Sequence, residues 1–149
     1  MDNKKIKNRR RAPKNIPHNR AFGSRCAGGR VDEERVGEMK IVYCSWFPFK
    51  GYKAITLLHW IVVRNDQRAR FTSTDYNHEC IHYEQEKELW FIGFYLLYII
   101  DFTLTMLYFW NWRKAYRNVA FEREAYDRQH DMQYIQHRKR FAWLKYDWE

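Results

Sequence analysis

The sequence predicts an α+β domain that is mostly helical and carries a short antiparallel sheet. Two runs between residues 40 and 63 are rich in β-branched and aromatic residues, which is typical of strands. From residue 73 onward the chain contains no proline and long stretches have helix-compatible spacing. The chain has 149 residues, of which 19% are aromatic, so we expect one core and a single domain.

Residues 1–39 are expected to form a basic N-terminal arm, and residues 40–149 the folded domain. Residues 1–30 combine ten Lys or Arg with a single acid, Asp2, and this excess equals the whole net charge of +9. The arm has no sustained apolar period, so a solvated extension is the simplest interpretation. Contact with nucleic acid or another anionic surface through residues 1–30 is the alternative.

Residues 40–46 and residues 54–63 are expected to be the strands of the sheet. The first run ends in a turn over residues 48–51, which contain a proline and a glycine. The second run is apolar on both faces, which predicts one buried strand. His59 lies within it and is interpreted as a core histidine. The polar residues 64–72 are expected to form a loop.

A helix is expected to begin at the cap candidates in residues 73–75 and to continue without a breaker to Gly93. Residues 90–112 are almost wholly apolar and long enough for about one bilayer crossing. Asp101 lies at the middle of this run, where an acid costs about 2.5–3.5 kcal/mol on insertion scales. We therefore favour a buried or interfacial helix over a membrane segment. Residues 113–134 predict a later helix.

The segment His78-Glu79-Cys80-Ile81-His82 carries the chemistry. Residues four apart share one face of a helix, so His78 and His82 can bind one ion, with Glu79 beside them. Imidazole nitrogens about 2.0–2.1 Å from zinc leave room for a water molecule, whose proton the carboxylate can take. The segment therefore predicts a zinc site for carbonyl hydrolysis. Two solvated histidines on a surface helix are the alternative, and Cys80 is interpreted as packing.

A catalytic zinc needs a third protein ligand, and acids are the candidates. Glu86 lies too far along the helix axis from the histidine pair. On the later helix, Glu122 shares its face with less charged neighbours than Glu124 does, so Glu122 is favoured and Glu124 is the alternative. An ordinary ion pair with Arg123 or Arg128 is the other interpretation of these acids.

Several further residues could support such a site. Gln85 lies one helical turn past His82 and could brace it, although a solvated glutamine is the more frequent case. A Tyr or His should stabilise the oxyanion, and Tyr126 and His130 are the candidates. The acids that could accept the outer ring N–H of a ligating histidine are Asp101, Glu124 and Asp127. The aromatic residues Tyr95, Tyr98 and Phe102 are interpreted as core or lipid contacts.

Residues 78–85, His-Glu-Cys-Ile-His-Tyr-Glu-Gln, and residues 116–126, Tyr-Arg-Asn-Val-Ala-Phe-Glu-Arg-Glu-Ala-Tyr, resemble the gluzincin class of zinc metallopeptidases. They are similar, more narrowly, to small bacterial and phage proteins with an HExxHxxQ helix and a later FExEA segment. The resemblance covers residues 46–146 and implies a minimal zincin-like fold around Zn²⁺. It implies as metal ligands His78, His82 and Glu122, and as general base and acid Glu79. Tyr126 departs from the membrane gluzincins, which commonly have an Asp there.

The predicted function is therefore hydrolysis of a peptide bond in a peptide or protein substrate. One alternative is a zinc-stabilised structural or binding protein of a virion or nucleoprotein assembly that uses its basic arm. The other is a protein anchored in a membrane through residues 90–112. No apolar run follows the basic N-terminus before residue 40, so no signal peptide is expected. Three widely spaced cysteines favour a reducing, cytoplasmic location, with membrane association as the alternative.

Overall fold

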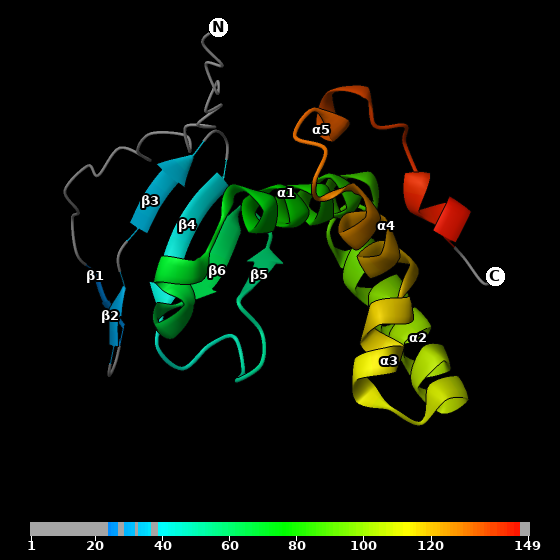
Figure 1. Ribbon diagram of the computed structural model, residues 1–149, viewed down its shortest axis with the longest axis horizontal. Helices are drawn as coiled ribbons and strands as arrows, with labels where there is room; N and C mark the ends of the chain where they lie inside the picture. Colours follow the sequence, from blue (N-terminus) through cyan, green and yellow to red (C-terminus); the bar gives the residue numbers. More distant parts are fainter. Residues whose placement is uncertain (1–23, 27–28, 32, 37–38, 147–149) are drawn as a thin grey trace, which may run out of the picture.

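The mostly helical α+β architecture expected from the sequence is confirmed in the computed structural model, which describes residues 24–26, 29–31, 33–36 and 39–146. Strands lie at one end of the molecule and the helices formed by residues 92–128 at the other (Figure 1). Helix α1, Ser73–Glu88, crosses between the two parts. It thus contacts both the sheet and the later helices, and this position makes it the centre of the site.

The expected basic arm, residues 1–39, lies partly outside the described residues. Inside it the structure describes three strands, β1 (Ser24–Cys26), β2 (Gly29–Val31) and β3 (Glu33–Val36). β1 and β2 form a two-stranded antiparallel pair, whereas β3 pairs antiparallel with the first strand of the domain. The main sheet therefore begins before the expected boundary at residue 40.

The main sheet is mixed, so the expectation of an antiparallel sheet was wrong. Its order is β3-β4-β6-β5, with β4 at Met39–Cys44, β5 at Ala54–Leu57 and β6 at Trp60–Arg64. β4 and β6 run parallel, and the other two pairs run antiparallel. A parallel pair depends on a crossover connection. The residue pattern of either strand alone therefore does not predict which strand it pairs with, or in which direction.

The single strand expected over residues 54–63 is a β-hairpin. Leu57 pairs with Trp60, so the chain reverses at Leu58 and His59, and Leu58 has a positive φ of 56°. The usual signal for a two-residue hairpin is Asn or Gly, and it is missing here. His59 is consequently exposed at the turn, which makes its interpretation as a core histidine wrong.

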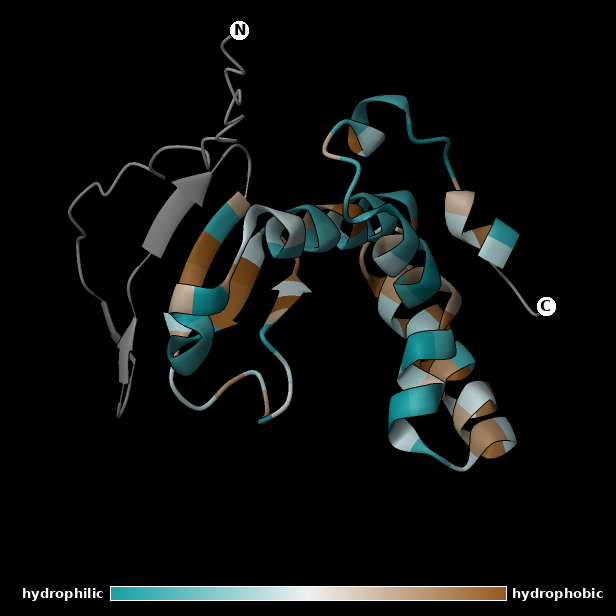
Figure 2. Ribbon diagram, in the orientation of Figure 1, coloured by the Kyte–Doolittle hydropathy of each residue, from teal (hydrophilic) through white to brown (hydrophobic). Residues whose placement is uncertain are grey.

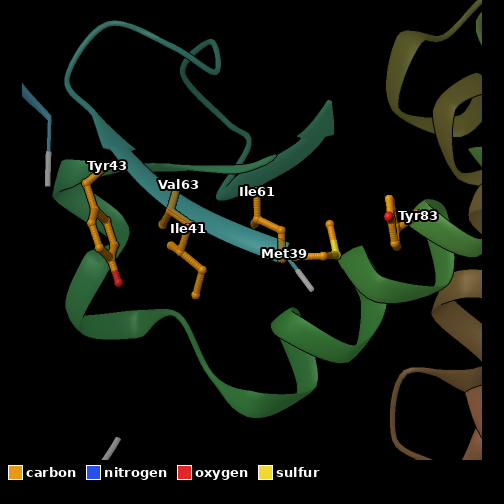
Figure 3. Packing of buried hydrophobic residues seen from close by; sticks show 6 residues of the cluster. All are labelled: Met39, Ile41, Tyr43, Ile61, Val63 and Tyr83. Carbon is orange, nitrogen blue, oxygen red and sulfur yellow. The ribbon is translucent and has the colours of Figure 1, made fainter. Parts of the chain in front are cut away.

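Alternate residues of β4 and β6 form the core beneath the sheet (Figure 3). Met39, Ile41 and Tyr43 point to one face, as the two-residue period of a strand requires. These side chains pack with Ile61, Val63 and Tyr83, the last of which lies on α1. Burial of this cluster fixes α1 across the sheet.

Cys80 packs against the same cluster from α1, as expected. Burial raises the pKa of its thiol to about 11. The thiol is thus protonated at neutral pH, and a protonated thiol is a poor metal ligand.

Helix α1 begins at Ser73, as expected, but its cap lies one residue before the expected cap candidates. Thr72 is the cap: its Oγ1 accepts from the Asp75 backbone N–H at 3.3 Å, and Asp75 Oδ2 accepts from the Thr72 N–H at 2.8 Å. This reciprocal pair is a capping box, which satisfies two amides of the first turn. The preceding segment, expected as a loop, contains a 3₁₀ helix at Asn65–Arg70.

The helix expected to continue to Gly93 ends instead at Glu88. Trp90 and Phe91 both have positive φ angles, 54° and 59°, and the chain turns there into α2, Ile92–Phe109. Positive φ costs energy in residues with a Cβ, so contacts elsewhere hold this turn. Phe91 supplies one of them, because it packs against the core cluster beneath the sheet.

The later helix expected over residues 113–134 is divided into separate helices. These are α3 (Trp112–Asn118), α4 (Ala120–Arg128) and α5 (Tyr134–His137). Val119 is extended and separates α3 from α4. Asp101 of α2 accepts a hydrogen bond from the Ala120 N–H at 2.7 Å and so caps the first turn of α4. The acid in the apolar run therefore has a structural role.

Replacing Asp101 with Ala should lower the free energy of unfolding by about 1 kcal/mol, because α4 would lose its cap. Urea denaturation followed by circular dichroism measures this change. Thr103→Ala, at an exposed position of the same helix, is the matched control and should have a smaller effect. Equal stability of the Asp101 variant and the wild type would contradict the capping role.

Candidate metal centre

His78, His82 and Glu122 converge on one point, each from a buried position. The two Nε2 atoms are 3.1 Å apart, and each lies 3.5 Å from a carboxylate oxygen of Glu122. Two atoms bound at about 2.0–2.1 Å to a tetrahedral ion lie about 3.3 Å apart. The structure therefore brings the three predicted ligands together at a spacing that could hold a metal ion.

The position of each ligand follows from its helix. His78 and His82 are one turn apart on α1, so their rings point to the same side. Glu122 is the third residue of α4, where the helix dipole favours a negative charge. The cap from Asp101 fixes that turn, and this places the Glu122 carboxylate opposite the histidine pair.

The charges of the three groups also fit a cation. Burial raises the pKa of Glu122, but the two histidines together lower it by more. The pKa of this carboxyl group therefore lies well below its usual range. Burial lowers the pKa of His82, yet Glu122 raises it to about 9. Oε2 of Glu122 is buried without a hydrogen-bond partner among the described residues. A divalent ion could use this oxygen and displace the histidine proton.

His82 is oriented by Gln85. The Nδ1 of His82 lies 2.8 Å from Gln85 Oε1, and Gln85 Nε2 donates to Phe121 O at 3.1 Å and to Glu124 Oε2 at 3.0 Å. Because two acceptors fix the amide, its oxygen faces the ring, so Nδ1 carries the proton. The lone pair of Nε2 is then available to a metal. Gln85 is fully buried, not solvated.

Glu124, the alternative third ligand, is not in the group. It is fully buried, and its Oε1 accepts from Tyr134 OH at 2.9 Å and from Arg138 Nε at 2.6 Å. Arg138 also pairs with Glu88 of α1. Glu124 thus supports the site indirectly, because it accepts a hydrogen bond from Gln85, which in turn contacts His82. The basic C-terminal run gave no local sign that Arg138 would be buried between two acids.

The other acids have separate partners. Asp101 caps α4, and Asp127 is exposed and accepts from Tyr146 OH at 2.7 Å. Neither is hydrogen-bonded to the outer ring nitrogen of a ligand histidine: that of His82 pairs with Gln85, and that of His78 has no hydrogen-bond partner among the described residues. Glu86 accepts from Tyr95 OH at 2.8 Å and is outside the group, as expected. Its burial raises the pKa of its carboxyl to about 7.

Three tyrosines surround the site, and the sequence indicated only one of them. Tyr98 packs against the core, as expected, and its hydroxyl also donates to Glu122 Oε1 at 3.0 Å. The Tyr126 ring lies 4.6 Å from the His78 ring, centroid to centroid. Tyr116 lines the cavities on both sides of the site. His130 is exposed and lines neither of these cavities.

Glu79 lies beside the histidine pair and is buried. Thr56 of strand β5 has its hydroxyl 2.8 Å from Glu79 Oε2 and 3.0 Å from the Glu79 carbonyl oxygen. Because the Thr56 hydroxyl contacts Oε2, the other carboxylate oxygen, Oε1, is available to accept a proton. Thr56 lies in a run expected to be one buried strand, so only the hairpin explains its position.

Two cavities meet at the site. The first, of about 350 Å³, is mainly apolar and reaches Glu79, His82 and Glu122. The second, of about 630 Å³, contains charged residues and reaches His78 and Glu79. Both volumes are in the range of small-ligand sites, about 300–1,000 Å³.

A scan against protein-family models, a search of curated proteins and a search of solved structures each find no match to this chain. The resemblance seen in the motifs is therefore not supported by a relative. The geometry of the site remains the evidence for its chemistry.

Replacing Gln85 with Leu should weaken zinc binding about 10- to 100-fold, because His82 would lose the acceptor that fixes its ring. Competition with a chromophoric chelator measures the affinity. Lys87→Ala, on the exposed side of α1, should bind zinc like the wild type. An unchanged zinc affinity in the Gln85 variant would exclude this orienting role.

Proposed function

We propose that this protein is a zinc-dependent peptidase of the gluzincin type. The observation that carries the proposal is the buried group of His78, His82 and Glu122, with Glu79 beside it. Two imidazole nitrogens and one carboxylate oxygen are a donor set that suits catalytic zinc. The two adjoining cavities leave space for substrate on both sides.

Zinc bound here would polarise the substrate carbonyl and lower the pKa of water toward about 7. Glu79 takes a proton from the attacking water as the water oxygen bonds to the carbonyl carbon. Glu79 then returns this proton to the amine nitrogen as the C–N bond breaks. Tyr116 and Tyr126 are the hydroxyl donors beside the site that can stabilise the oxyanion.

Exchanging Glu79 for Gln should leave zinc bound and reduce peptide cleavage about 10²- to 10⁴-fold, because no carboxylate would accept the proton. Elemental mass spectrometry gives the zinc content, and mass spectrometry of a peptide library gives cleavage. Glu84→Gln, on the same helix, is the matched control and should keep both properties. Full activity in the Glu79 variant would refute its role.

The companion variant Glu122→Ala should lose both zinc and cleavage, because it removes a ligand. An unchanged zinc stoichiometry would show that another residue completes the site. If wild-type protein binds zinc, gains thermal stability from it and cleaves no peptide, the zinc-stabilised structural protein is the better description. Deleting residues 1–30 would then test whether the basic arm binds nucleic acid in a salt-sensitive manner.

We also propose that α2 attaches the protein to a membrane surface. The helix is 18 residues long and apolar enough to cross a membrane, and only 11% of it is buried. Most of its visible ribbon is pale to brown in Figure 2, toward the hydrophobic end of the colour scale. At 1.5 Å per residue it is about 27 Å long. Its exposed large residues recur on one face at helical spacing, and they include Ile92, Leu96, Ile99, Ile100, Leu104 and Leu107.

The neighbouring groups favour a helix that lies on the bilayer over one that spans it. Asp101, the only acid of α2, points inward and accepts from the Ala120 N–H, so it places no charge on the exposed face of the helix. Helix α3 packs along α2 and exposes three cations, which include Arg113 and Lys114. A spanning helix would carry them into hydrocarbon at about 2.5–3.5 kcal/mol each. Trp90 and Trp110, 88% and 82% exposed, suit the interface at the two ends of α2.

The wild-type protein should sediment with vesicles of phosphatidylcholine and phosphatidylglycerol. Replacing Leu96 and Ile100 with Glu should weaken vesicle binding at least about tenfold. Each of these side chains would be buried in the bilayer on binding, and such burial contributes about 1.5–3 kcal/mol. Leu144→Glu, at an exposed apolar position on another element, is the control. A dimer that forms through α2 and ignores vesicles would overturn the proposal.

A further inference from the structure

Resting on the proposed peptidase function, we infer the class of substrate. The geometry points to a peptide with a bulky apolar side chain on one side of the scissile bond and an anionic group on the other. The two cavities that meet at the site differ in chemistry, and this difference carries the inference.

The apolar cavity is walled by aromatic and aliphatic side chains from several elements. It touches the site through His82 and Glu122. Apart from the site residues, its walls offer few polar groups, so an apolar side chain gains the most from entering it. The main wall residues are Phe47, Pro48, Phe94, Ile99 and Phe102.

The second cavity is lined by four cations and only two acids. The cations are Lys50, Lys53, Arg113 and Arg117, and the acids are Asp75 and Glu79. Lys53 and Asp75 neutralise one another, with Nζ and Oδ1 2.8 Å apart. Among the described residues, Lys50, Arg113 and Arg117 have no acid within salt-bridge distance. Their positive charge would favour an anion in this cavity.

A carbonyl held at the site must direct its two substituents into different cavities. Glu79 lines both, so the reacting bond lies between them. Ala54 of β5 also lines both, and β5 is the last strand of the described sheet order. An extended peptide along this edge would thus pass from the apolar cavity to the basic one.

Peptide binding by the zinc-loaded Glu79→Gln protein tests the preference without cleavage. Four acetylated, amidated tetrapeptides serve as probes: Phe-Gly-Gly-Glu, Phe-Gly-Gly-Gln, Ser-Gly-Gly-Glu and the reversed Glu-Gly-Gly-Phe. Isothermal titration calorimetry should show that one of the two orders with both Phe and Glu binds about tenfold tighter than the peptides lacking either feature. The favoured order tells which cavity takes the N-terminal side.

Variants locate the preference in the second cavity. Arg113→Ala combined with Arg117→Ala should remove the advantage of Glu over Gln and leave the advantage of Phe over Ser. Lys114→Ala is the matched control, because Lys114 is an exposed cation of α3 outside the cavity. Retention of the Glu advantage in the double variant would overturn the assignment.

The outcomes separate this inference from the function on which it rests. If wild-type protein binds zinc and cleaves peptides, while Glu and Gln peptides bind equally, the substrate inference fails and the peptidase function stands. If wild-type protein takes up no zinc, or cleaves none of a broad peptide library, the peptidase function itself fails. Added salt should weaken the binding of the Glu peptide and leave the binding of the Gln peptide unchanged, because only the Glu side chain makes a contact between charges.

Discussion

The helices of this protein are arranged around a buried carboxylate that faces two imidazoles. Glu122 is enclosed with His78 and His82, and its negative charge would be costly there without a cation. A histidine proton can supply the positive charge, and so can a metal ion. Asp101 and Tyr98 hold this carboxylate from α2, one through the helix cap and one through a direct hydrogen bond.

Behind the ligands lies a continuous chain of buried polar contacts. It runs from His82 through Gln85 and Glu124 to Arg138, which also binds Glu88. Each member satisfies the next, so the loss of one would leave buried partners uncompensated. The chain joins α1, α4 and the C-terminal segment, and it thereby links the orientation of one imidazole to the packing of three elements.

Helix α2 has two faces with different tasks. Its inner face contributes Phe94, Tyr98 and Asp101 to the core and the site. Its outer face exposes a stripe of aliphatic side chains. Ile99 belongs to that stripe and also lines the apolar cavity. The surface proposed to contact lipid therefore adjoins the cavity proposed to take the apolar part of a substrate.

The features that depend on local spacing could be predicted from the amino-acid sequence. The i, i+4 pair of His78 and His82 had to share a helix face, and the less charged surroundings of Glu122 favoured it over Glu124. The hairpin at Leu58, the breaks between helices, and the positions of Tyr98 and Arg138 became visible in the folded molecule alone. These depend on partners far apart in the chain, and such contacts leave no periodic signal in the segments that make them.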